Sequence, residues 1–216
     1  MLISEPVTTL TDYAIAVEAL IFAGLLLKPK PKSLIHPPVL FWAAAFVGLA
    51  IAAVCGGTYH GFVSLPIDVR WGLWRGIIYA LSFTSGCMLA AAVSDLPRWV
   101  KPWGWGAIAL KSAIYLSWTA FYPNFVYIIV DYLSAMLLIL LLQRRRSDRQ
   151  INRRTSSSWI VAGVLGSLVA AGVQGVGFKG TACFNQNDLY HLVQMVALYF
   201  FYRGACVIKH SSLAHR

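Results

Sequence analysis

The sequence predicts an all-α, polytopic membrane protein, with residues 1–216 forming one domain of seven transmembrane helices. Three observations predict this fold. Of the 216 residues, 58% are hydrophobic and only 12% are charged, which is about half the charged share of a soluble domain. Seven stretches approach the length of apolar chain that crosses a bilayer. Fourteen of the 18 Lys and Arg residues fall on one side of the resulting bundle.

Prolines and basic residues mark the ends of the predicted spans. The fifth span is the plainest, because the uninterrupted apolar run 136–142 leads directly into three arginines. The sixth carries Ala162, Gly166 and Ala170 at the four-residue spacing that is typical of close helix contacts in lipid. The fourth has Lys111 at its centre, so a six-span arrangement is the alternative. In order, the spans are 11–27, 39–60, 71–94, 103–120, 124–142, 159–177 and 188–207.

The basic residues orient the bundle. They follow the odd-numbered spans, so the positive-inside rule places the N-terminus outside and the C-terminus in the cytoplasm, in a plasma (inner) membrane. The net charge of +10 is then explained by orientation and by anionic lipid headgroups rather than by nucleic acid. The expected partners are membrane lipids and a lipid-like or small-molecule ligand. Cys55 and Cys183 lie on the same outer side, where a disulfide between them is compatible with an oxidising compartment.

Two charges in the fourth and fifth spans are expected to form an ion pair. Lys111 and Asp131 each lie about ten residues, or roughly 15 Å along a helix, from the turn 121–124. Antiparallel neighbours would bring them to one level, and a charge in hydrocarbon needs such a partner. The pair is either a structural link or part of a charge relay.

The first span holds two carboxylates. Asp12, next to Thr11, is the type of residue that starts a helix, and we expect it close to the membrane interface. Glu18 lies two turns deeper, where it needs a cation, a polar helix or a proton. Glu18 is therefore a candidate functional residue.

Two histidines are expected at similar shallow depth on the outer side. His60 ends the second span after Gly56 and Gly57, and His191 opens the seventh. Asp188 and Gln194 lie three residues to either side of His191, on the same helical face, with Asn187 one turn before it. The small-residue stripe of the sixth span continues to Gln174, which is expected to face the bundle interior.

These motifs resemble those of the CREST group of seven-helix membrane proteins, which includes alkaline ceramidases and the progestin/adiponectin-receptor family. Its members share a histidine at the end of an early span and an HxxxH pair at the start of the last span, and the histidines hold a zinc that activates water. Tyr59 and His60 look like the early element. Residues 187–191 look like the late element, with Asn187 in place of its first histidine.

The resemblance implies a zinc-dependent hydrolase of lipid-like amides or esters. His60 and His191 would bind the metal, with Glu18 or Asp188 as third ligand, since a catalytic zinc usually takes three protein ligands and a water. Asp188 would otherwise act in catalysis, and Ser82 or Tyr79 would stabilise the oxyanion. Two other readings of the histidines stay open, a structural hydrogen-bond network and bis-histidine haem ligation. The alternative function is a non-enzymatic small-molecule receptor or a proton-coupled transporter.

Overall fold

The fold was analysed in a computed structural model that describes residues 3–28, 35–144, 151–177 and 184–214. The described residues form seven α-helices joined by short connections. They are α1 (Pro6–Leu27), α2 (Pro37–Gly61), α3 (Ile67–Ser94), α4 (Lys101–Phe121), α5 (Phe125–Arg144), α6 (Ile151–Val176) and α7 (Gln186–Ala214).

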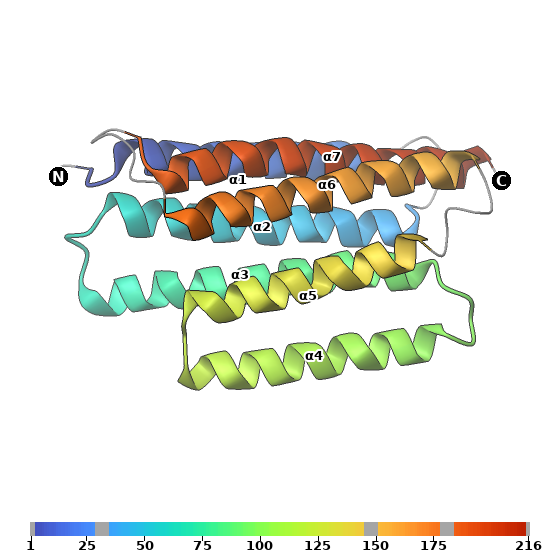
Figure 1. The fold of residues 1–216 in the computed structure, drawn as a ribbon, viewed down its shortest axis with the longest axis horizontal. Helices are drawn as coiled ribbons and strands as arrows, with labels where there is room; N and C mark the ends of the chain where they lie inside the picture. The colour runs from blue at the N-terminus through green and yellow to red at the C-terminus, as the bar shows by residue number, and fades with distance from the viewer. Residues whose placement is uncertain (1–2, 29–34, 145–150, 178–183, 215–216) are drawn as a thin grey trace.

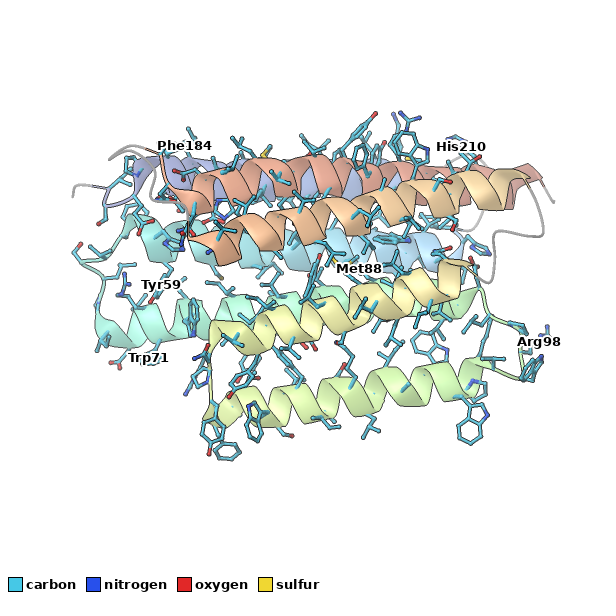
Figure 2. All side chains as sticks on the ribbon, viewed as in Figure 1. Tyr59, Trp71, Met88, Arg98, Phe184 and His210 are labelled. Carbon is cyan, nitrogen blue, oxygen red and sulfur yellow. The ribbon has the colours of Figure 1, made fainter. Side chains whose placement is uncertain are left out.

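Successive helices run in opposite directions along one long bundle (Figure 1). α1, α3, α5 and α7 begin at one end, which we call the N-terminal end, and the other helices finish there. The side chains of Tyr59 and Phe184 lie at this end, whereas Arg98 and His210 lie at the other (Figure 2). This alternation brings the end of α2 close to the beginnings of α1 and α7.

Six of the described helices are long and apolar enough to cross a membrane, namely all except α4. The protein is therefore an all-α chain with the helices of a membrane-embedded bundle. α4 has the length of a span, but with Lys111 in its middle it is not among these six. It lies at the edge of the bundle against α3 and α5, and only Tyr115 and Thr119 of its side chains are buried.

Two helices begin earlier than the predicted membrane spans, and the earlier start of α1 matters for the site. α1 begins at Pro6 rather than near residue 11, because proline fits the first turn of a helix, where its missing N–H is not needed. Asp12 consequently lies in the second turn of α1 and is buried, instead of starting the helix. α6 begins at Ile151, eight residues before the predicted start of the sixth span.

Small residues bring the helices of the bundle into close contact, as they do where lipid replaces water. The predicted stripe on α6 lies against α7, where a Cβ built on Gly166 would meet the Cβ of Ala197 at 3.0 Å. Gly204 of α7 lies even closer to α6. A Cβ at this position would meet Ile160 Cγ1 at 2.7 Å and the backbone oxygen of Ser156 at 3.3 Å. The backbones of α6 and α7 therefore approach each other as closely as glycine allows.

The substitution Gly204→Ala should destabilise the fold by about 1–3 kcal/mol, since the added methyl group overpacks the α6–α7 contact. The matched control is Gly24→Ala in α1, where the new Cβ has nothing within 4 Å. That variant should be neutral or gain about 0.5–1 kcal/mol from reduced backbone freedom. Unfolding of the purified protein in one detergent would compare them, and equal stability of the two variants would contradict this packing.

Candidate functional site

A cavity of about 360 Å³ lies inside the N-terminal half of the bundle, among α1, α2, α3, α5, α6 and α7. Its volume is in the range of ordinary small-molecule sites. The polar residues that line it include Asp12, His60, Ser167, Gln174, Asn187, His191 and Gln194. The apolar residues include Ile15, Leu49, Ile77, Leu81, Leu133 and Met136.

The lining changes from polar to apolar with depth. His60, Gln174 and Asn187 lie within about 3 Å, measured along their helices, of the N-terminal end. The apolar residues Leu81 and Met136 lie roughly 16–21 Å from that end. The cavity therefore has one polar end and one apolar end.

His191 links α7 to α1 at the polar end. Its Nδ1 lies 2.8 Å from the Thr11 hydroxyl, and its Nε2 lies 3.3 Å from Asp12 Oδ1. The roles in the Thr11 contact depend on which ring nitrogen of His191 carries the proton, because the Thr11 hydroxyl can also donate to the backbone oxygens of Val7 and Thr8, each at 3.0 Å. Thr11 does not line the cavity, whereas Asp12 and His191 do.

One carboxylate oxygen of Asp12 has no partner among the described residues. The residue is only 6% exposed, and its Oδ2 is buried without a hydrogen-bond partner in this part of the chain. α2 makes room for this carboxylate, because a Cβ on Gly56 would lie 3.2 Å from both of its oxygens. The glycine pair before the His60 motif thus accommodates Asp12, and a Cβ on Gly57 would meet Asp12 Cβ at 3.0 Å.

His60 also lies at the polar end, where its Nδ1 is 3.5 Å from both carboxylate oxygens of Glu5. The two predicted histidines therefore line one cavity. His60 faces Glu5, the residue just before α1, and His191 faces Asp12 of α1.

Asp188 is a structural residue in this geometry. It accepts hydrogen bonds from the Thr8 hydroxyl at 2.7 Å and from the backbone N–H of Asn185 at 2.7 Å. It is 1% exposed and does not line the cavity. Its role as a catalytic residue or metal ligand therefore stays a prediction, without support from the cavity wall.

Two amides complete the polar end. Gln174 of α6 donates to Asn187 Oδ1 at 2.9 Å, but its own Oε1 is buried without a partner. Gln194 lies deeper and donates to the Ser167 hydroxyl at 3.2 Å. The expectation that Gln174 faces the interior agrees with its position in the cavity wall.

Ser82 and Tyr79 were expected to complete the site as oxyanion donors, and their position corrects this. Both line a separate groove between α3 and α4, on the far side of α3 from the histidines. Tyr79 is 42% exposed there. A helix presents a different face every few residues, and the sequence alone did not show which face of α3 meets the cavity.

The described residues give the zinc hypothesis no third ligand. No group of three His, Cys, Asp or Glu side chains within them is arranged to hold a metal ion. Glu18, the proposed third ligand, does not line the cavity, and its Oε2 is buried without a partner. Cys183, the expected disulfide partner of Cys55, lies outside the described residues.

Comparison with known families gives one match, a family model that covers residues 7–210. The chain belongs to DUF6962, a family of unknown function. No curated protein and no solved structure matches it. The resemblance to the CREST group thus stays a prediction, and the function of this DUF6962 chain has to be argued from its site.

The most informative residue that sequence reasoning missed in this DUF6962 chain is Asp12. The signal that was missed is Pro6. A proline there indicates that the helix begins earlier, which places Asp12 in the second turn of α1. Sequence reasoning also missed that Tyr132 of α5 lines the cavity. A tyrosine in an apolar helix is equally typical of packing, so its sequence position gave no signal.

The structure brings Lys111 and Asp131 together, away from the cavity. Lys111 Nζ lies 2.5 Å from Asp131 Oδ1, and the Ser85 hydroxyl of α3 donates to Oδ2 at 2.5 Å. The side chain of Asp131 is 3% exposed and that of Lys111 is 18% exposed. Because neither residue lines the cavity, this geometry favours the structural link, which joins α4 to α3 and α5.

Replacing Asp131 alone should lower folded yield and stability, because it leaves the partly buried Lys111 ammonium without its counter-charge. Loss of one partner of a buried pair costs about 3–5 kcal/mol. Asp131→Asn should therefore fold poorly, and Lys111→Gln combined with Asp131→Asn should recover part of the loss.

The measurement is the fraction of each variant that is monodisperse in detergent, together with its unfolding midpoint. Asp68→Asn, which removes an exposed carboxylate at the start of α3, serves as the control and should behave like the wild type. Equal behaviour of the single and double variants would contradict the ion pair.

Proposed function

We propose that the protein is a non-enzymatic membrane receptor or carrier that binds a lipid-like amphiphile in the cavity of its N-terminal half. The observation behind this is the polarity gradient of the lining, from His60, Asn187 and Gln174 at the end of the bundle to Leu81 and Met136 inside it. A molecule with a polar head and an alkyl chain matches this gradient. A water-soluble metabolite would leave the apolar half of the cavity unmatched.

A hydrolase has less support from the same geometry. Hydrolysis needs a nucleophile, or an activated water, that faces the bound molecule. The hydroxyl that contacts His191 belongs to Thr11, which is outside the cavity wall, and the described residues supply no metal site. The Asp12–His191 contact remains available for binding a polar head.

The proposed topology is seven spans, with the N-terminal end on the outer side of the plasma (inner) membrane. Basic residues at the other end support this orientation, among them Arg98, Lys101, Arg203 and Lys209. α4 counts as the seventh span because it lies along α3 and α5, and because Asp131 offsets the charge of its Lys111. The cavity would then receive its ligand from the outer leaflet.

Filling the cavity should abolish ligand binding without unfolding the protein. Ala171 lines the cavity, so Ala171→Phe would place a ring in it, whereas Val169→Phe on the same helix replaces a side chain that is 59% exposed. A second matched pair lies on α5. Leu133→Trp changes a residue of the cavity wall, whereas Leu137→Trp, one helical turn further on, changes a side chain that is 55% exposed.

The assay is thermal unfolding in phosphatidylcholine nanodiscs with added dodecanol, dodecylamine, N-dodecylacetamide or dodecanoate. A ligand at a hundred times its Kd stabilises a folded protein by about 2.7 kcal/mol. At least one probe should raise the Tm of the wild type and of the exposed-site variants, but not of the cavity variants. Equal shifts in all variants, or cleavage of N-dodecylacetamide by the wild type alone, would contradict the proposal.

A further inference from the structure

We infer that the ligand carries a primary amine as its polar head and that the carboxylate of Asp12 binds it. This inference rests on the proposed function and adds the chemical class of the ligand. It comes from the polar atoms of the cavity that the protein itself leaves unpaired.

Two residues that line the cavity each keep a hydrogen-bond acceptor without a partner among the described residues. Asp12 Oδ2 and Gln174 Oε1 are both buried, and neither has a donor among the described residues. Buried polar groups are nearly always paired, and leaving one unpaired costs about 1–3 kcal/mol, more for a charged group. Other described atoms share this state, such as Glu18 Oε2 and Tyr115 Oη, but their residues do not line the cavity.

The charges around Asp12 also favour a cation. Glu5 and Asp188 are the other carboxylates near the polar end, and within the described residues no lysine or arginine forms an ion pair with any of these three. Asp12 faces His191 and Glu5 faces His60. A positively charged head would supply a counter-charge that no described lysine or arginine supplies, and an anionic head would meet like charge.

The aromatic side chains of the wall suit a cation as well. Trp74, Tyr132 and Tyr190 line the same cavity as Asp12. An ammonium group close to aromatic rings gains a further cation–π attraction. These rings would also border the start of the alkyl chain.

Depth decides how such a molecule would lie. Asp12 is about 9 Å from the N-terminal end, measured along α1, and the apolar part of the wall continues from Ile15 to Met136. An amine at Asp12 would therefore direct its chain towards Leu49 and Met136. The amide of Gln174, closer to the end of the bundle, leaves its acceptor for a second donor such as a hydroxyl on the head.

An amine differs from the other heads because it combines charge with N–H donors. Hydrogen bonds between charged groups are about twice as strong as neutral ones. A neutral alcohol or amide donates without charge, and a trimethylammonium group has charge without a donor. Comparison of these heads on one alkyl chain therefore separates the two contributions.

The test compares dodecylamine, dodecanol and dodecyltrimethylammonium in the nanodisc unfolding assay. The Tm shift that each probe causes in Ala171→Phe is subtracted, because it reports general effects on the bilayer. The wild type should reach a given Tm shift at a concentration of dodecylamine about tenfold lower than of either other probe, which corresponds to about 1.4 kcal/mol. In Asp12→Asn, which keeps the shape but removes the charge, dodecylamine should lose this advantage.

Glu18→Gln is the matched control, because it removes a carboxylate of α1 that is outside the cavity wall. It should keep the preference for the amine. If dodecanol binds the wild type as tightly as dodecylamine, or if Asp12→Asn keeps the preference, the amine inference fails although the cavity still binds amphiphiles. If no probe discriminates the wild type from Ala171→Phe, the proposed function itself fails.

Discussion

The interior of a membrane offers no water, so each polar group buried there needs a partner within the protein. Most of the described polar residues in this bundle meet that requirement. Lys111 pairs with Asp131, and Asp188 accepts from Thr8 and from the backbone of Asn185. Against this background Asp12 stands out, because this residue lines the cavity while its buried Oδ2 has no hydrogen-bond partner among the described residues. The inference that the ligand carries an amine rests on that contrast.

Glycine makes this arrangement compatible with close packing. Gly56 and Gly57 let α2 approach α1 at the level of Asp12, so the carboxylate can be buried and still border the cavity. Any larger residue at Gly56 would come within 3.2 Å of the carboxylate oxygens. α1 and the residue before it thus contact both histidines, His191 through Thr11 and Asp12, and His60 through Glu5. Helix packing and the polar chemistry of the site depend on the same few positions.

The sequence predicted the helices well, because apolar length and basic flanks directly reflect the membrane. It also placed Lys111 opposite Asp131, since equal distances from a tight turn determine equal depth. It failed where helix rotation or exact helix ends decide the outcome. Asp188 turned out to bond within the protein, Ser82 faces a different groove, and Asp12 lies deeper than expected. Composition and spacing do not determine the rotation of each helix about its axis or the residue at which it begins. Both depend on how all the helices pack.

The most direct test of the central claim is a crystal structure of the protein with 12-bromododecylamine, in which anomalous scattering locates the bromine. The account predicts a bromine peak among Leu49, Leu133 and Met136, with the amine nitrogen within hydrogen-bond distance of Asp12 Oδ2. Such a peak would establish both the site and the direction of the chain. A bromine found only on the lipid-facing surface, or a reversed chain with the amine away from Asp12, would contradict it.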